Sequence, residues 1–310
     1  MSETKFRLVT RSDFDGLVCA MILKELDMID DIKFVHPKDM QDGKVEVSKR
    51  DITTNLPYVP GVHLAFDHHL SETIRIGGKP ENHIIDPDAP SAARVVYKYY
   101  GAEKVIKKVT ADMMLAVDKG DSANFTREEV LKPEGWNLMN FLMDARTGLG
   151  RFKEFRVSNY QLMMNLIDYC LDHTIQDVLA LPDVRERIDL YFEQQEKFTV
   201  QMRRCTTVKG KVAIIDLREE DPIYVGNRFL VYALYPDANV SIHIMRGFQN
   251  EKTVFAVGKS IFDKSSKANI GELMLKYGGG GHANAGTCQV WHQDASQVME
   301  VLVARLNMAS

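Results

Sequence analysis

The stretch Phe66-Asp67-His68-His69-Leu70-Ser71-Glu72 decides the fold. Apolar residues lead into it from Val62, and then an acid and two neighbouring imidazoles precede a polar turn. This pattern is typical of a buried parallel strand that presents polar side chains at its carboxyl end, where open α/β sheets place their sites. Taken alone, the stretch is equally compatible with a strand end that carries two solvated histidines.

Length and composition limit what the chain can be. Its 310 residues predict two domains, or one large domain with an appendage, and the shares of 45% apolar and 26% charged residues are those of a globular protein. The net charge of −4 gives no overall positive field. We therefore expect a small phosphate-containing partner, bound by local charge, and no long duplex nucleic acid.

Cellular location is predicted from the cysteines and the apolar runs. The four cysteines are far apart and form no CxxC, which suits reduced thiols. The first residues contain no apolar leader, and no apolar run approaches the length of a membrane span. These features predict a cytoplasmic protein with no membrane partner, and a homodimer is an open alternative to a monomer.

Short strands alternate with helices in the first part of the chain, which predicts a doubly wound, mainly parallel sheet. The stretch from Lys38 to Asn55 is polar and is not assigned to a strand. The predicted strands cover 6–10, 32–36, 62–66 and 84–86, and the predicted helices cover 17–28, 92–100 and 103–118.

The second half begins with helices and then changes character after Cys205. The pattern is helical from about 136 to 202, and the charged helix over 184–204 is the predicted connector between domains. A smaller α/β domain is expected over 205–310, following a first domain over 1–183 that includes the helical segment 136–183. Its predicted strands are 212–215, 240–245, 253–257 and 287–290, with helices over 226–234, 270–277 and 295–306.

Asp13 and Asp15 flank Phe14 in the turn after the first predicted strand. An aspartate often caps a helix, which accounts for one of the two carboxylates. A calcium loop of the EF-hand type is excluded because its other acids and closing glutamate are missing. Two carboxylates at the carboxyl end of a strand instead favour a site for a hard cation.

The run Gly278-Gly279-Gly280-Gly281-His282-Ala283-Asn284-Ala285-Gly286 is the least ambiguous local signal. Consecutive glycines allow the backbone to turn either way and leave amides to face an anion, while His282 adds a donor and Gly286 allows close approach. A flexible surface loop is the alternative, but the run lacks serine or acidic padding. The predicted phosphate-binding residues are Gly279, Gly280, Gly281, His282 and Gly286.

Together these motifs resemble those of the DHH phosphoesterase superfamily, in the exopolyphosphatase-like and oligoribonuclease-like branch with a DHH-associated C-terminal domain. Asp67-His68-His69 is similar to the motif that names the family, and Asp13-Phe14-Asp15-Gly16 to its first motif. Asp118 resembles the fourth motif, and Gly278 to Gly286 the substrate-binding motif of the C-terminal domain. The resemblance spans nearly the whole chain, with the motifs in the family's order.

The resemblance implies a divalent-metal-dependent phosphohydrolase that uses an activated water. The substrates would be small nucleotides, short oligonucleotides or polyphosphate, cleaved at a phosphoester or phosphoanhydride bond. Asp15, His68 and Asp118 resemble ligands of one Mn²⁺ ion, and Asp13 a ligand of another. His69 resembles the residue that contacts the scissile phosphate, and His282 with the glycines the group that holds the rest of the substrate.

Two positions depart from the family pattern. Arg11 occupies the place of a histidine or acid in the first motif, and Asn55, or less favourably Asp51, occupies the place of a metal-bridging aspartate. Arginine cannot ligate a metal, but its charge can stand where a cation would have been.

We therefore expect His68, His69 and Arg11 to act in catalysis, with His69 and Arg11 also binding substrate. The expected cofactor is Mn²⁺, with one ion favoured over two and Mg²⁺ as the alternative metal. A family member that has lost catalysis and binds a nucleotide or phosphate is the alternative function.

Overall fold

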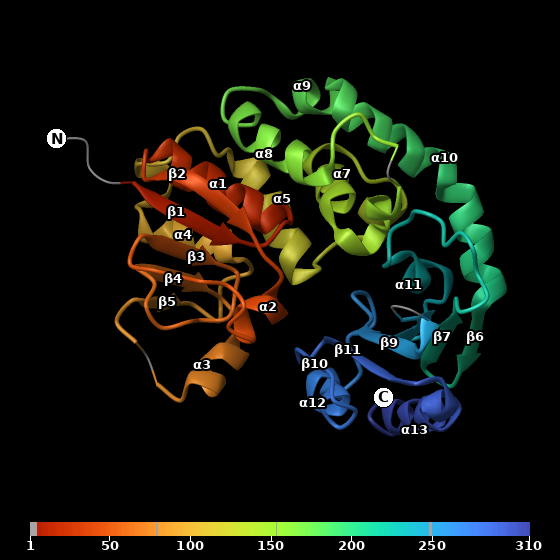
Figure 1. The fold of residues 1–310 in the computed structure, drawn as a ribbon. Coiled ribbons are helices and arrows are strands. Elements are labelled where there is room, and N and C mark those ends of the chain that lie inside the picture. Colours follow the sequence, from red (N-terminus) through yellow and green to blue (C-terminus); the bar gives the residue numbers. More distant parts are fainter. Residues whose placement is uncertain (1–4, 79, 153, 248–249) are drawn as a thin grey trace. The chain divides into compact units, whose positions relative to one another are not determined.

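The computed structural model describes residues 5–78, 80–152, 154–247 and 250–310 (Figure 1). The chain forms two compact units, and the last of the three boundaries between them lies within helix α10 (Pro182–Cys205). The expected connector helix is therefore shared by both units. The first unit comprises Met1–Phe125 and Pro133–Asp189, and the second comprises Thr126–Lys132 and Leu190–Ser310.

The first unit contains a five-stranded sheet in the order β2-β1-β3-β4-β5, and every pair of neighbouring strands is parallel. The predicted parallel α/β sheet is thereby confirmed. Because the chain steps from β1 outward to β2 and then returns to β3, the topological switch point lies between β1 and β3. The strands are β1 (Phe6–Thr10), β2 (Ile29–Phe34), β3 (Asp51–Thr54), β4 (Leu64–Asp67) and β5 (His83–Ile85).

Strand β3 lies in the polar stretch that was not expected to form a strand, so this expectation is wrong. All four of its residues are buried, although only Ile52 is apolar. Part of the polarity is satisfied inside the sheet, since Thr54 Oγ1 donates to Thr10 Oγ1 at 2.7 Å. A buried strand with so few apolar residues lacks the hydrophobic run by which such strands are found.

Helix α1 (Phe14–Glu25) is buried from Phe14 to Leu23 and packs against α4, α5 and α8. It begins three residues earlier than expected because Asp13 caps it, with Oδ1 accepting the Gly16 N–H at 3.0 Å. A Cβ on Gly16 would lie 2.0 Å from the Arg11 carbonyl oxygen, so only glycine fits this turn.

Helices α4, α5, α7 and α8 of this unit contact α1, and α9 contacts α7. Helix α5 begins later and ends later than expected, because 102–104 form a separate 3₁₀ turn and the helix continues to Ser122. The helices are α2 (Pro37–Gln41), α3 (Leu70–Ile76), α4 (Ala92–Tyr99), α5 (Ala111–Ser122), α7 (Gly135–Met143), α8 (Asn159–Tyr169) and α9 (Ile175–Ala180).

The second unit contains a mixed sheet in the order β10-β11-β9-β8-β7-β6, in which only β7 and β8 are parallel. This confirms a second α/β region, and β6 is a strand that was not expected. The strands are β6 (Thr206–Lys209), β7 (Val212–Asp216), β8 (Val240–Arg246), β9 (Lys252–Lys259), β10 (Gly280–Gly281) and β11 (Ala285–Trp291).

One face of this second sheet carries the core of the unit. Ile242, Phe255 and Cys288 from three strands pack with Met274 of α12 (Ile270–Leu275) and Leu302 of α13 (Ala295–Met308) (Figure 1). Burying each large apolar side chain of this kind contributes about 1.5–3 kcal/mol.

Two short helices complete the second unit. Helix α6 (Arg127–Leu131) contacts α11 (Leu230–Leu234), although a long stretch of the first unit separates them in sequence. Arg127 donates to the Ala233 carbonyl at 3.0 Å, and Asn227 donates to the Val130 carbonyl at 3.4 Å. Within the described residues, no helix combines the length and apolar character needed to cross a membrane.

Candidate metal centre and phosphate site

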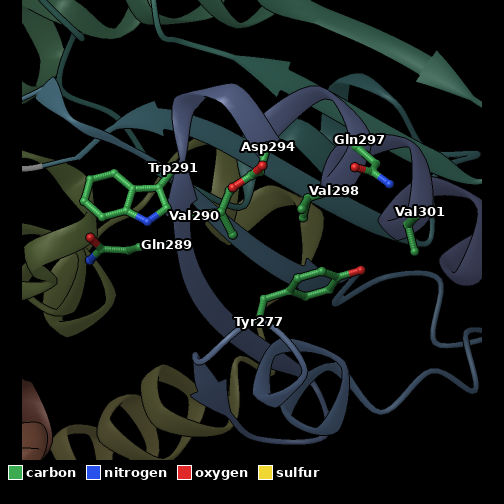
Figure 2. A pocket seen from close by; sticks show the side chains of 8 residues that line it. All are labelled: Tyr277, Gln289, Val290, Trp291, Asp294, Gln297, Val298 and Val301. Atoms are coloured by element: carbon green, nitrogen blue, oxygen red, sulfur yellow. The ribbon is translucent and has the colours of Figure 1, made fainter.

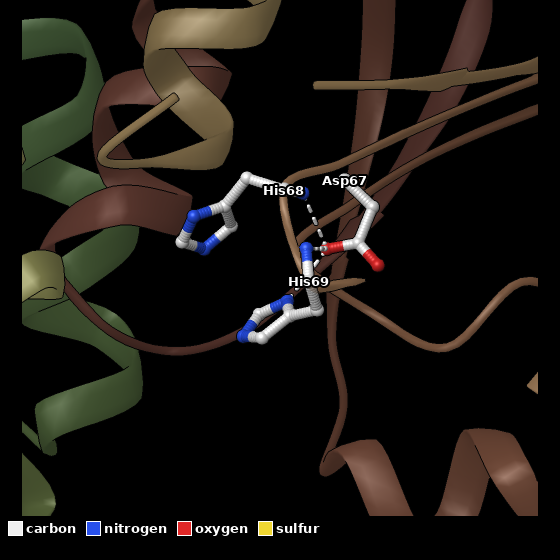
Figure 3. A group of neighbouring side chains, drawn as sticks. All are labelled: Asp67, His68 and His69. Carbon is white, nitrogen blue, oxygen red and sulfur yellow. Dashed lines mark hydrogen bonds and ion pairs between the residues drawn. The ribbon is translucent and has the colours of Figure 1, made fainter. Parts of the chain in front are cut away.

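The Asp67-His68-His69 motif lies at the carboxyl end of β4, as expected, and Asp67 organises it (Figure 3). Oδ1 of Asp67 accepts the backbone N–H of His68 at 2.8 Å and of His69 at 3.3 Å. The same oxygen lies 2.6 Å from Nδ1 of the His69 ring. Because Asp67 engages Nδ1, only Nε2 of His69 can contact a substrate.

The two ring nitrogens of His68 have different partners. Its Nδ1 lies 3.1 Å from the Ala89 carbonyl oxygen, which can only accept, so Nδ1 carries a proton. Its Nε2 lies 2.6 Å from Oδ2 of Asp121. A metal-ligating histidine usually donates the N–H of its non-ligating nitrogen to such a carbonyl, so Nε2 is the nitrogen of His68 that could bind a metal.

Asp15 is buried in the first turn of α1 and faces the start of α4. Its two oxygens accept the N–H groups of Ala92 at 3.2 Å and Ala93 at 2.7 Å. These amides belong to the first turn of α4, where the helix dipole stabilises negative charge. Burial nevertheless raises the pKa of Asp15 well above its ordinary value, and the charges of Asp121 and Asp13 raise it further.

Asp15, His68 and Asp121 form one cluster, in which one ligand atom from each residue lies within 4.8 Å of the others. Ligands about 2.1 Å from a common ion are separated by roughly 3–4 Å, so the spacing fits a single cation. Two carboxylate oxygens with one imidazole nitrogen suit Mn²⁺ or Mg²⁺ better than a soft metal.

The charges of the cluster residues shift the pKa values of their neighbours. Burial lowers the pKa of His68, but the hydrogen bond and charge of Asp121, together with Asp15 and Asp67, raise it to about 9. Burial disfavours the charged form of Asp121, yet the hydrogen bond and charge of His68, with Arg11, bring its pKa below the ordinary value. In the absence of an ion, a proton on His68 thus partly balances the carboxylates.

Asp118, which was expected in this cluster, lies elsewhere. Its Oδ1 accepts from the Ser91 hydroxyl at 2.8 Å, and its Oδ2 accepts from Nε of Arg94 at 2.9 Å. Asp118 therefore holds the beginning of α4, and within the described chain it joins no metal-type group.

Asp121 takes the position in the cluster that was expected for Asp118. The helix was expected to end at Asp118, but α5 continues for one more turn to Ser122. That turn carries Asp121 to His68. The repeated acid one turn later on the same helix was the available signal for Asp121.

Asp13 and Arg11 occupy the turn after β1 and are paired with each other. Oδ2 of Asp13 lies 3.0 Å from Nε of Arg11, and Oδ1 caps α1, so both oxygens of Asp13 are engaged. The charge of Asp13 raises the pKa of Arg11 against the effect of burial, with further contributions from Asp121, Asp15 and Asp144. Arg11 is therefore a permanent positive charge near the cluster.

Asn55 and Asp51 lie at opposite ends of β3. Asp51 begins the strand and binds Arg7 at 2.7 Å and the Ser48 N–H at 2.5 Å. Asn55 directly follows the strand, at the carboxyl edge where Arg11 and His68 are found. Of the two candidates for the second motif, only Asn55 lies on the side of the sheet that carries the cluster.

The glycine run in the second unit is more ordered than expected. Gly280 and Gly281 form β10 and pair with Thr287 and Gly286 of β11. The Gly279 N–H donates to the Met274 carbonyl at 3.0 Å, and the His282 N–H to the Ala285 carbonyl at 2.7 Å. The expectation that the glycine amides are left to face an anion is therefore wrong for Gly279.

Close backbone packing explains part of the glycine run. A Cβ on Gly279 would lie 2.1 Å from the Thr287 carbonyl oxygen, and one on Gly281 would lie 2.3 Å from the Ala285 carbonyl oxygen. Gly281 also has φ = 150°, a backbone conformation that other residues rarely adopt. A Cβ on Gly280, by contrast, would meet nothing within 4 Å.

Gly279→Ala is expected to destabilise the second unit by about 1–3 kcal/mol, because the added methyl group must displace backbone. Gly280→Ala is the matched control and should unfold at nearly the wild-type temperature, since its methyl group enters open space. Thermal unfolding of both variants makes the comparison. Equal melting temperatures would show that packing does not require the glycine at 279.

A pocket of about 460 Å³ in the second unit does not belong to this site (Figure 2). It lies between Tyr277, the edge of β11 and the first turns of α13. Its one charged side chain is Asp294, and no basic group lines it, so it does not suit a phosphate. The lining residues are Tyr277, Gln289, Val290, Trp291, Asp294, Gln297, Val298 and Val301.

Comparison with solved structures shows that the chain belongs to the DHH phosphoesterase superfamily. It is similar to PggH, a pGpG-specific phosphodiesterase from Vibrio cholerae, with 59% identity and a TM-score of 0.84 over 99% of this chain and 100% of that one. RecJ from Thermus thermophilus, in complex with Mn²⁺, shares the fold at 14% identity and a TM-score of 0.50, over 97% of this chain and 52% of its own. No family model matches the sequence, and no curated protein matches it either.

These findings confirm the predicted superfamily and the predicted class of enzyme, a phosphohydrolase. The match to PggH extends over 99% of this chain and so includes both units. The individual roles of the site residues are taken up as proposals below.

Proposed function

We propose that the protein hydrolyses the phosphodiester bond of a linear dinucleotide of the pGpG type and releases two mononucleotides. The full-length identity of 59% to a pGpG-specific phosphodiesterase carries this proposal. The cluster of Asp15, His68 and Asp121 supports it, because a divalent cation held there could activate water for attack on a phosphodiester. A member without catalysis is disfavoured by the same identity.

The proposed centre holds one divalent cation, Mn²⁺ or Mg²⁺, on Asp15, His68 and Asp121. When bound, such an ion supplies a Lewis acid that lowers the pKa of a water ligand and polarises a phosphoryl oxygen. The amides of Ala92 and Ala93 orient the Asp15 carboxylate, and the Ala89 carbonyl fixes the ring of His68. RecJ, which shares the fold, is known in complex with Mn²⁺, and this agrees with the expected type of cofactor.

His69 is proposed to bind the scissile phosphate through Nε2. In the protonated form of the ring, Nε2 donates to a phosphate oxygen while Asp67 accepts the proton of Nδ1 at 2.6 Å. Asp67 is 1% exposed, so the pair is shielded from solvent on the side of Asp67. His282, Gly279, Gly280, Gly281 and Gly286 remain the predicted residues for the rest of the substrate.

Hydrolysis assays with the purified protein test the proposed function. With Mn²⁺ or Mg²⁺ present, we expect pGpG to be cleaved to GMP much faster than a cyclic dinucleotide, pyrophosphate or polyphosphate. Chelation should abolish the activity, and restored metal should recover it. Binding of pGpG without turnover under every metal condition would support the alternative of a protein that only binds.

Metal affinity should depend on pH, because the cation must displace a proton from His68. The raised pKa of about 9 means that this proton is bound at neutral pH. Affinity for Mn²⁺ should therefore rise by about tenfold per pH unit as the pH increases toward 9, and then level off. Calorimetric titrations between pH 6.5 and 9 measure this slope, and a constant affinity would contradict it.

The oligomeric state and the cellular location are part of the same proposal. The four cysteines are free thiols, and three of them are buried, which supports a reducing cytoplasmic location. A homodimer stays a prediction, which sedimentation of the full chain measures.

A further inference from the structure

Asn55 has a buried side-chain amide that makes no hydrogen bond within the described residues. Its side chain is 1% exposed, and neither Oδ1 nor Nδ2 has a hydrogen-bond partner within the described part of the chain. Buried polar groups without partners are costly and uncommon in native proteins. Its φ of 55° lies in the left-handed region, which asparagine tolerates better than most residues. These observations indicate that something other than the protein satisfies this amide.

Arg11 and Asn55 follow neighbouring strands at the carboxyl edge of the sheet. In the parallel register of β1 and β3, Leu8 pairs with Ile52 and Val9 with Thr53, and a continuation of this register by two steps places Arg11 level with Asn55. Oγ1 of Thr10 also donates to the Thr54 carbonyl at 3.2 Å, which supports this continuation of the register.

This location is also where the strand order reverses. Open α/β sheets bind ligands in the crevice outside the carboxyl ends of the strands at such a switch point. The order β2-β1-β3 puts the switch point between the strands that carry Arg11 and Asn55. The side-chain amide of Asn55 lies at this switch point and is therefore positioned to bind a ligand.

The groups available there are suited to an anion. A guanidinium has five N–H donors and no acceptor, and its ion pair with Asp13 uses only part of them. The Asn55 amide adds two donors from Nδ2. Phosphate oxygens accept such bonds, and a fixed, permanently charged guanidinium recognises them strongly.

The side chains at this place do not suit a second cation. Arg11 carries a permanent positive charge, and neither Arg11 nor the neutral amide of Asn55 offers a carboxylate to hold a cation there.

We propose that Arg11 and Asn55 form an anion subsite for a nonbridging oxygen of the scissile phosphate, beside a centre that holds one divalent cation. The proposal rests on the proposed function, because it assigns two more binding residues to the same phosphodiesterase site. In this arrangement, the permanent positive charge of Arg11 acts beside the cation at Asp15, His68 and Asp121.

Binding of GMP and guanosine to the Mn²⁺-loaded protein tests the subsite without turnover. Wild type should bind GMP more tightly than guanosine, and Arg11→Gln should weaken GMP binding by about 10- to 100-fold while guanosine binding stays the same. Asn55→Gly should act in the same direction, because glycine removes the amide and accepts the positive φ without strain. Metal analysis should find one tightly bound Mn²⁺ per wild-type chain.

Two further variants keep the test decisive. Arg7→Gln removes an arginine from the same strand β1 at the opposite edge, where Arg7 binds Asp51, and should bind GMP like wild type. Asn55→Ser removes the amide, keeps a short polar side chain and adds no metal ligand of the carboxylate type. It should also weaken GMP binding, and it replaces Asn55→Gly if that variant does not fold.

The outcomes separate this inference from the proposed function. Unchanged GMP affinity in Arg11→Gln and in the Asn55 variants, two tightly bound Mn²⁺ ions in wild type, or wild-type binding of GMP no tighter than guanosine would each overturn the subsite. A wild-type protein that binds no divalent cation and cleaves no dinucleotide would instead overturn the proposed function.

Discussion

Asp121→Asn is expected to weaken binding of the divalent cation by more than about 100-fold and to reduce phosphodiesterase activity in proportion. Even residues that only orient a metal ligand are worth about 10- to 100-fold in affinity or activity, and Asp121 is proposed as a ligand itself. Its Oδ2 lies 2.6 Å from Nε2 of His68, the nitrogen proposed to face the ion. Titration of Mn²⁺ and steady-state hydrolysis of pGpG measure both effects.

Asp118→Asn is the matched control, one turn earlier on the same helix. It should keep the metal affinity of wild type, because Asp118 binds Ser91 and Arg94 at the start of α4. The substitution should instead lower the free energy of unfolding by about 1–3 kcal/mol, because it weakens a charged hydrogen bond. Thermal unfolding measures this loss. If Asp118→Asn loses the cation and Asp121→Asn keeps it, the assignment based on the sequence is correct after all.

His68→Ala and His69→Ala should separate metal binding from phosphate binding. His68→Ala should lose the cation, because it removes the only nitrogen ligand of the cluster. His69→Ala should keep the cation but lower kcat by about 10²–10³-fold, as expected when one donor to a reacting phosphate is removed. Metal content and kcat measured on the same preparations distinguish the two variants.

The division of roles between the neighbouring histidines has a structural basis. Nδ1 of His68 binds the Ala89 carbonyl, whereas Nδ1 of His69 binds Asp67. Each ring is thus anchored by a different partner. Two variants that lose metal and turnover to the same degree would show that this division is wrong.

Much of the architecture could be predicted from the sequence. Strands β1 and β4 have apolar runs that end in polar residues, and parallel strands gather such ends at one edge of the sheet. Helix α4 was also recognisable, since Ser91 caps it and Gly101 follows its end. These local signals agree with the fold and therefore located the Asp67-His68-His69 motif correctly.

The parts that were missed depend on tertiary contacts. Strand β3 is buried by its two neighbours despite its threonines, so a search for hydrophobic periodicity passes over it. Helix α5 continues past Gly120, where a Cβ would lie 2.3 Å from Oδ1 of Asn140 in α7. Packing between α5 and α7 thus favours a glycine within α5. From the sequence alone, such a glycine indicates the end of a helix. That extra turn is what separates Asp118 from Asp121.

Helix α6 has a consequence for how the chain can be divided. The chain passes from one unit to the other at 125, returns at 132 and passes again at 189, so no single cut separates the units. A fragment that ends at Asp189 would carry Arg127 and the apolar side chain of Val130 without Ala233 and Asn227. A nick in α10 should therefore give two fragments that stay associated, whereas independent expression of the second unit requires the peptide over 126–132 to be supplied or grafted.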